Sequence, residues 1–172
     1  EPLMKLISEL KESKTYDIII IDSIPFYELR YTRMACKVAD YRIIVTTPRE
    51  IDIWRTNYMI DTLVSEGIVD RNELRGSFKV LINKVPASSI ADKVIQRKWS
   101  ELKFESIQKY NIDVFKSFIP EREAFAIPVT PTEDKRPEFM DKSWKIEGKK
   151  VKGSDIIGNI TNEVIKWIDL RK

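Results

Sequence analysis

The residue of this chain best placed for chemistry is Asp22, which follows a run of four isoleucines from Ile18 to Ile21. Four consecutive apolar residues lack period-2 alternation, a pattern typical of a parallel strand that is covered on both faces. Open α/β sheets bind their ligands at the carboxyl ends of such strands. Two interpretations of Asp22 follow: a carboxylate that holds an ion or lies beside a phosphate, or a capping residue at the end of a buried strand.

Several other kinds of chemistry are excluded by residue types that the chain lacks. It has no histidine and one cysteine, Cys36. His-based triads, nearly all His-ligated metal sites, cysteine metal cages and internal disulfides are therefore ruled out. None of the five glycines belongs to a GxxxxGKS or GxxxxGKT loop, in which successive backbone N–H groups and a lysine surround a phosphate. The chain therefore contains no phosphate cradle of this kind.

Composition places the chain among ordinary globular proteins. Hydrophobic residues make up 42%, charged residues 33%, and the formal net charge is +3. No apolar run approaches the roughly 20 residues that a membrane-spanning helix needs. We expect residues 1–172 to form a single α/β domain, with no membrane contact and a cytoplasmic location.

Hydrophobic periodicity predicts alternating helices and strands. Strands are expected at 16–22, 41–47, 78–83 and 113–119. Helices are expected at 3–10, 29–39, 51–66, 89–110 and 156–170, with a Pro- and Lys-rich loop over 128–153. Gly67 is the expected stop of the third helix. Strands that alternate with helices predict a mostly parallel sheet flanked by helices.

Four motifs then occur in an order and spacing that resemble one family, the ParA/MinD-type deviant Walker P-loop ATPases. The family's IIIDTPP or IIIDSPP motif reads IIIIDSIP at 18–25, and its ADYVIIPVQPE reads ADYRIIVTTPRE at 39–50. LINKV at 81–85 is similar to LNKV, and FIPER at 118–122 is similar to the strand that ends in IPR. With the final amphipathic helix, the resemblance covers most of 3–170 and corresponds to the carboxyl-terminal two-thirds of a ParA-like partition ATPase.

The resemblance implies a P-loop NTPase-like fold of the SIMIBI type from which one strand is missing. In these ATPases the P-loop strand lies between the strands that here end at Asp22 and Thr47. The P-loop, and the catalytic Asp of the first switch region, precede the part that this chain matches. The resemblance therefore implies no catalytic residue within these 172 residues. Two apolar strands beside a gap leave backbone groups unpaired, which is costly. We therefore expect this chain to be the carboxyl-terminal portion of a longer ATPase domain, or to be joined by a separate P-loop segment. A degenerate relative whose sheet is completed in another way is the alternative.

The resemblance also assigns roles to individual residues. Asp22 would hold Mg²⁺ through a coordinating water, which suits a hard cation that keeps much of its hydration shell. Asn83 would bind the adenine edge of ATP, and Pro120 with Glu121 would wall the base pocket. The plainer interpretations are a polar residue that ends a strand for Asn83 and a strand terminator for Pro120.

The partners implied are a second copy in an ATP-dependent homodimer, non-specific DNA and a ParB-like centromere-binding protein. Residues 135–152 carry seven basic and three acidic side chains, an excess of four positive charges that suits phosphate contact. Lys149, Lys150 and Lys152, together with Arg122, are the expected DNA contacts. A solvated basic loop is the alternative. The final helix mixes acidic residues with its apolar stripe, which favours core packing over membrane anchoring.

Two other functions are left open. One is a ParA-like scaffold that binds proteins without nucleotide turnover, which nucleotide binding by a complete protein would distinguish. The other is a receiver-like signalling domain, in which Asp22, Thr47 and Lys84 would mimic the phosphoacceptor site. The long spacing from Thr47 to Lys84 and the surplus strand at 113–119 argue against it.

Overall fold

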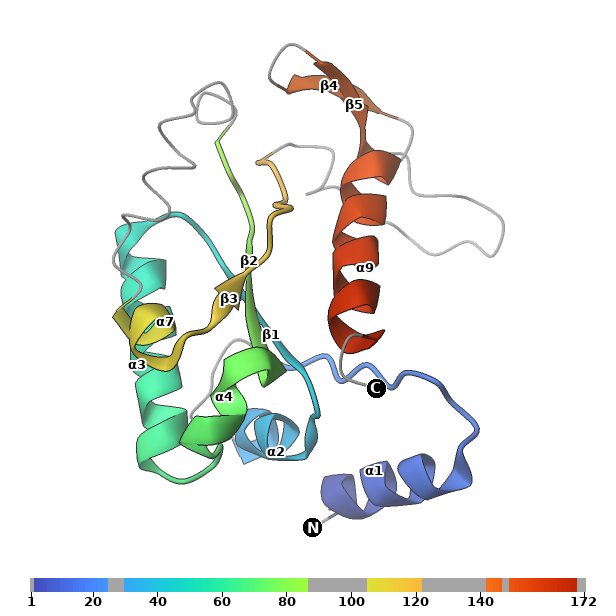
Figure 1. Cartoon of the computed structure of the whole chain (residues 1–172), viewed down its shortest axis with the longest axis vertical. Helices are drawn as coiled ribbons and strands as arrows, with labels where there is room; N and C mark the ends of the chain where they lie inside the picture. Colours follow the sequence, from blue (N-terminus) through green and yellow to red (C-terminus); the bar gives the residue numbers. More distant parts are fainter. Residues whose placement is uncertain (1, 25–29, 87–104, 122–141, 147–148, 170–172) are drawn as a thin grey trace.

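The computed structural model of the chain describes residues 2–24, 30–86, 105–121, 142–146 and 149–169 (Figure 1). Its centre is a three-stranded parallel sheet in the order β1-β2-β3. The strands are β1 (Arg42–Thr46), β2 (Phe78–Ile82) and β3 (Asp113–Val114). The expected α/β class, a parallel sheet flanked by helices, is confirmed.

Helices cover both faces of β2 (Figure 1). On one side lie α3 (Glu50–Ser65), α4 (Arg71–Ser77) and α7 (Glu105–Tyr110), and on the other lies α9 (Gly153–Asp169). Successive side chains of a strand point to opposite faces. Val80 and Ile82 accordingly pack in the core with α3, whereas Leu81 packs with Phe115 and Trp167 of α9.

The backbone pairing of β3 with β2 continues beyond Asp113 and Val114. The N–H of Phe115 donates to the carbonyl of Val80 at 2.9 Å, and the N–H of Ile119 donates to that of Ile82 at 2.9 Å. An isolated parallel bridge then joins Val85 to Pro120. The chain from 113 to 120 therefore runs beside β2 along its whole length, as the predicted strand at 113–119 requires.

Two amino-terminal helices lie at one end of the sheet (Figure 1). They are α1 (Pro2–Ser13) and α2 (Arg30–Val38). The Nζ of Lys11 lies 2.7 Å from an Asp40 carboxylate oxygen, and this contact ties α1 to the end of α2. Among the helices that the structure describes, none is long and apolar enough to cross a membrane.

The predicted strand at 16–22 is wrong. This segment makes no strand pairing in the structure, and the Ile20 side chain is 87% exposed. The reason lies in β1, which forms one edge of the described sheet and pairs there with β2 but with no other described strand. None of the strands that the structure describes lies beside segment 16–22, and Ile18 and Ile24 are exposed as well.

The prediction of a loop over 128–153 is also wrong in part. Strands β4 (Ser143–Ile146) and β5 (Lys149–Lys152) form an antiparallel hairpin at the start of α9 (Figure 1). The apolar Trp144, Ile146 and Val151 alternate with polar residues, a period-2 pattern that the high lysine content masks. The rest of that loop, and most of the helix expected at 89–110, lie outside the described residues; only α7 of that helix is described.

The turn after α3 forms as expected at Gly67, which has a φ of 66°. The N–H of Gly67 donates to the carbonyl of Val64 and that of Ile68 to the carbonyl of Leu63, both at 3.0 Å. These two bonds make a Schellman motif, in which a left-handed residue satisfies the last carbonyls of a helix. Helix α4, which follows, was not expected from the sequence; the Asp70 side chain caps it by accepting from the N–H of Asn72.

Candidate functional site

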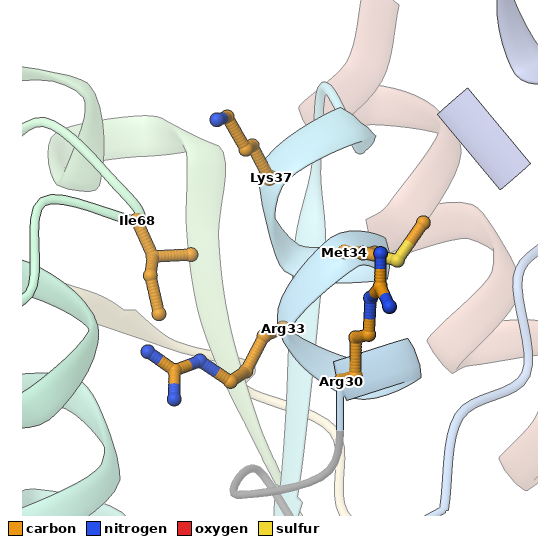
Figure 2. Close-up of a pocket in the computed structure, with 5 residues that line it drawn as sticks. All are labelled: Arg30, Arg33, Met34, Lys37 and Ile68. Atoms are coloured by element: carbon orange, nitrogen blue, oxygen red, sulfur yellow. The ribbon is translucent and has the colours of Figure 1, made fainter. Parts of the chain in front are cut away.

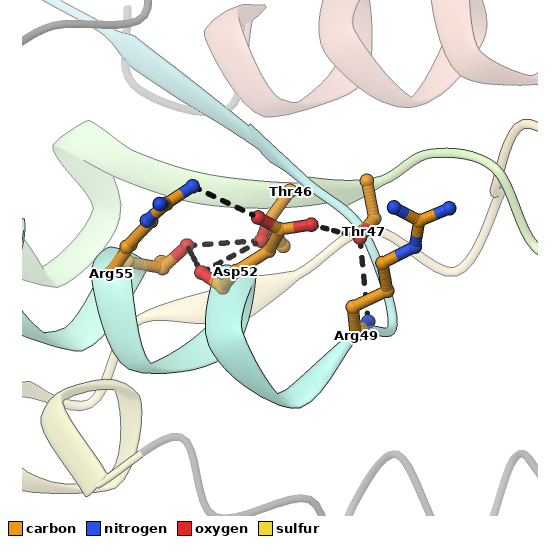
Figure 3. Close-up of polar contacts among 6 residues, drawn as sticks. Thr46, Thr47, Arg49, Asp52 and Arg55 are labelled. Carbon is orange, nitrogen blue, oxygen red and sulfur yellow. Dashed lines mark hydrogen bonds and ion pairs between the residues drawn. The ribbon is translucent and has the colours of Figure 1, made fainter.

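The carboxyl ends of β1 and β2 lie side by side, and this edge of the sheet is the candidate site. The loop from β1 to α3 is held there by Asp52 in the first turn of α3 (Figure 3). Its carboxylate accepts from the Thr47 hydroxyl and lies 3.8 Å from the Arg55 guanidinium. The Thr47 hydroxyl in turn accepts from the N–H of Arg49 at 3.3 Å. An acidic residue in this first turn also suits the positive end of the helix dipole.

Two buried threonines join the strand to the helix below this loop. The Thr56 hydroxyl donates to the Asp52 carbonyl at 2.8 Å and lies 3.0 Å from the Thr46 hydroxyl. The Thr46 hydroxyl lies 3.3 Å from the same carbonyl. Buried hydroxyls with partners are stable, whereas unpaired ones are costly. These hydroxyls therefore help to hold the end of β1 against the first turns of α3.

Asn83 stands at the end of β2, next to the end of β1. Its N–H donates to the carbonyl of Thr46 at 2.7 Å. Its side-chain oxygen accepts from the N–H of Lys84 at 2.8 Å, and Lys84 has a φ of 55°, which non-glycine residues adopt uncommonly. One function of Asn83 is thus local: its amide oxygen stabilises a left-handed turn directly after the strand.

Pro120 and Glu121 lie beside this turn. Pro120 forms the parallel bridge with Val85, and the N–H of Glu121 donates to the Val85 carbonyl at 2.8 Å. The Pro120 side chain is fully buried, and Glu121 is exposed. The structure thus brings three sequence-predicted residues, Asn83, Pro120 and Glu121, to one edge. Pro120 contributes there to packing beneath the surface.

Asp22 is not held at this edge by any strand pairing. It is exposed and belongs to the unpaired segment 16–24, which is linked to α2 where the Thr32 hydroxyl donates to the Ile24 carbonyl at 3.2 Å. The residues that the structure describes contain no group of three His, Cys, Asp or Glu side chains that could hold a metal ion. Magnesium often takes only one or two protein carboxylates and keeps its water. The magnesium role of Asp22 therefore stays a prediction.

The residues expected to contact DNA lie mainly on the hairpin. Lys149, Lys150 and Lys152 belong to β5, and the side chains of Lys150 and Lys152 are exposed. The N–H of Lys152 donates to the Asp155 carboxylate at 2.9 Å, which joins the hairpin to the first turn of α9 in the manner of a capping box. Arg122 lies outside the described residues.

Asp52 was missed by reasoning from the sequence. The signal was present, because an acidic residue follows the strand and Pro48 by a few positions, where the first turn of a helix was expected. Both of its carboxylate oxygens have partners within the loop. Asp52 therefore acts by positioning the end of β1.

Comparisons of the chain with protein-family models, with curated proteins and with solved structures give no match.

Proposed function

We propose that this chain is the carboxyl-terminal portion of a ParA-like ATPase, an ATP-dependent dimerisation switch that acts in DNA or plasmid segregation. The observation that carries this function is the position of Asn83 and of the 120–121 segment, which pairs with Val85, at the same carboxyl edge of a parallel sheet. An amide offers both a donor and an acceptor to a base edge. The Asn83 oxygen already accepts from Lys84, so the amide group would present its NH₂ to the adenine.

The open edge of the sheet supports the need for a P-loop strand. On β1, Val45 is 56% exposed, and Ile43 is exposed beside it. In the isoleucine run at 18–21, which makes no strand pairing, Ile18 and Ile20 are exposed. Unpaired strand edges are costly in water, and an added apolar strand between β1 and the isoleucine run would pair the backbone groups of both. The P-loop segment of the complete protein supplies that strand and, with it, the phosphate cradle.

In the complete protein, ATP and Mg²⁺ bind at the site that the P-loop segment completes, and their binding stabilises a homodimer. The dimer holds DNA through basic surface that includes Lys150 and Lys152, and a ParB-like partner stimulates hydrolysis and release. Asp22 holds the hydrated magnesium once the strand at 16–22 is formed. Turnover therefore requires the P-loop segment, and the 172 residues alone do not hydrolyse ATP.

Nucleotide binding tests this function. The coding sequence upstream of Glu1 is determined first, and a KGGxGKS or KGGxGKT segment after an apolar strand is expected. Binding of a fluorescent ATP analogue is then measured with the complete protein, with Asn83→Ala and with the matched control Asn159→Ala, an exposed amide on α9. Asn83→Ala is expected to weaken binding about tenfold, and Asn159→Ala to leave it unchanged.

The magnesium role is measured in the same protein. Asp22→Ala should abolish magnesium-dependent turnover, whereas Asp17→Ala, an exposed carboxylate in the same segment, should not change it. Equal turnover in both variants would remove Asp22 from the site. A complete protein that binds no nucleotide would instead be a ParA-like scaffold without phosphate chemistry.

A further inference from the structure

The chain that continues β3 contains a bulge opposite β2. The N–H of Phe115 donates to the Val80 carbonyl and that of Ile119 to the Ile82 carbonyl, both at 2.9 Å. Between these two bonds β2 advances by two residues, whereas its neighbour advances by four. Bulges interrupt the ladder of a sheet, and they are common next to active sites, where they re-aim the chain. The backbone N–H groups inside the bulge need acceptors other than β2.

Glu163 of α9 supplies those acceptors. One oxygen of its carboxylate accepts from the N–H of Lys116 at 3.1 Å, and the other accepts from the N–H of Ser117 at 3.0 Å. Figure 1 shows the chain after β3 bending on the side where α9 lies. Two consecutive N–H groups that point to one carboxylate form the kind of backbone nest that binds anions, and bonds to a charged acceptor are stronger than neutral ones. Glu163 thus holds a bulge that lies 46 residues earlier in the sequence.

The bulge decides which residues reach the carboxyl edge of the sheet. Pairing with the chain after β2 resumes directly beyond it, where the N–H of Val85 donates to the Ile119 carbonyl at 3.1 Å and the N–H of Glu121 to the Val85 carbonyl at 2.8 Å. If the bulge relaxed into regular pairing, its two extra residues would push Pro120 and Glu121 about 7 Å further along the strand. They would then lie beyond the turn that follows Asn83.

Helix α9 has other contacts that hold it on the sheet. Trp167 packs with Leu81 and Phe115, and its indole N–H donates to the Gly76 carbonyl at 2.8 Å. These contacts lie about one turn of α9 beyond Glu163 and involve neither residue of the 116–117 bulge. Packing therefore fixes the helix, and the bonds of the Glu163 carboxylate add the position of the bulge.

We propose that Glu163 is a positioning residue: by holding the 116–117 bulge, it sets the register in which Pro120 and Glu121 meet the chain at the end of β2. In the ATPase proposed above, these two residues wall the base pocket beside Asn83. The consequence for nucleotide binding therefore rests on that proposed function. The effect on the register does not, and it is measured separately.

Amide hydrogen exchange in the 172-residue chain tests the register. Glu163→Ala removes both acceptors, and Glu163→Gln keeps one. The matched control is Asp155→Ala, because this carboxylate of α9 also accepts a backbone N–H, that of Lys152 on the hairpin. Glu163→Ala is expected to speed exchange at Ile119 and Glu121 at least about tenfold relative to exchange at other core amides, since only the pairing beyond the bulge opens. Glu163→Gln should have a smaller effect, and Asp155→Ala none.

Two exchange results would overturn the positioning role. Unchanged exchange at Ile119 and Glu121 in Glu163→Ala would show that the register does not depend on Glu163. An equal increase at all core amides would show that the carboxylate contributes only to global stability, because global unfolding exposes every amide alike.

Nucleotide binding by the complete protein tests the consequence. Glu163→Ala is expected to raise the Kd of a fluorescent ATP analogue about fivefold and to reduce the preference for ATP over GTP analogues. A loss of stability alone would not change that preference. Asp155→Ala should leave both quantities unchanged, and equal losses in the two variants would overturn the positioning role. A complete protein that binds no nucleotide would refute the proposed function instead, and the exchange rates would still decide the role of Glu163.

Discussion

The indole Nε1–H of Trp167 donates to the backbone carbonyl of Gly76 at 2.8 Å, across 91 residues of sequence. Gly76 has a φ of 87° just before β2, and Trp167 lies near the end of α9. The same indole meets the Phe115 ring edge-on, with the ring centroids 6.0 Å apart. This one side chain therefore fixes the carboxyl-terminal helix against two strands of the sheet.

Substitutions of Trp167 should lower the free energy of unfolding, and the loss should grow with the part of the side chain that is removed. Trp167→Phe loses the hydrogen bond and leaves the Gly76 carbonyl without that donor, at a cost of about 1–3 kcal/mol. Trp167→Ala also leaves a cavity and should cost about 3–5 kcal/mol of the free energy of unfolding. Urea unfolding measures both. The control Trp54→Phe, on an exposed face of α3, should change stability by less than about 0.5 kcal/mol. Equal losses of stability in Trp54→Phe and Trp167→Phe would contradict the anchoring role of Trp167.

Two glycines should respond to alanine with opposite signs. Gly67 has a φ of 66°, so Gly67→Ala is strained and should lower the free energy of unfolding by about 1 kcal/mol. Gly158 lies inside α9 with open space around the position of a Cβ atom. Gly158→Ala should therefore stabilise by roughly 0.5–1 kcal/mol through helix propensity. Thermal unfolding of the two variants provides the comparison, and a loss of stability in both would show that α9 does not tolerate the added methyl group.

The thiol of Cys36 should titrate at higher pH in the folded chain than in the unfolded chain. Burial raises the pKa of Cys36 from 9.0, and the nearby Arg42 charge lowers it by less. The folded chain thus retains the thiol proton where the unfolded chain loses it. The resulting stability is fully present below pH 9.0 and is lost as the pH rises through the folded value. Alkylation by iodoacetamide in buffer and in urea measures this difference, and equal rates at all pH values would contradict it.

Substitution of Ile20 should affect stability differently in the 172-residue chain and in a longer protein that contains the P-loop strand. Because its side chain is 87% exposed, Ile20→Lys should change the stability of the 172-residue chain by less than about 0.5 kcal/mol. In a longer protein with the P-loop strand, the same substitution would bury a charge and should cost about 3 kcal/mol or more. Tyr31→Lys, at a residue 73% exposed on α2, serves as the control and should be neutral in both. A neutral Ile20→Lys in the longer protein would mean that the segment does not join the sheet.

The hairpin lysines should set the salt dependence of DNA binding. Lys150→Glu/Lys152→Glu in the complete, ATP-bound protein removes two phosphate contacts. The plot of log affinity against log salt should then become less steep by about 1.8. Fluorescence anisotropy with a DNA duplex measures the slope. Lys5→Glu/Lys14→Glu, on α1 and just after it, is the matched control. The same slope in both double variants would place the DNA-binding surface elsewhere.

Much of the fold could be predicted because its signals are local. The period of apolar residues identified α3, β1, β2 and α9 to within a few residues, and Gly67 marked the end of α3 because a left-handed turn favours glycine. The order of strands and helices likewise predicted a parallel sheet. The same order brought Asn83 and Pro120 to one edge, since parallel strands end on the same side.

Tertiary structure decided what depends on partners distant in sequence. The isoleucine run has the composition of a buried strand, yet a strand forms only where a neighbour accepts its backbone hydrogen bonds, and no strand in the described part of the chain lies beside it. The hairpin at 143–152 forms because β4 and β5 supply those bonds to each other despite their lysines. The pocket that α2 lines together with Ile68 requires the turn after α3 to lie close to a helix some thirty residues earlier in the sequence (Figure 2). Periodicity along the chain determines which elements form, whereas pairing and packing between them determine which surfaces stay open to a partner.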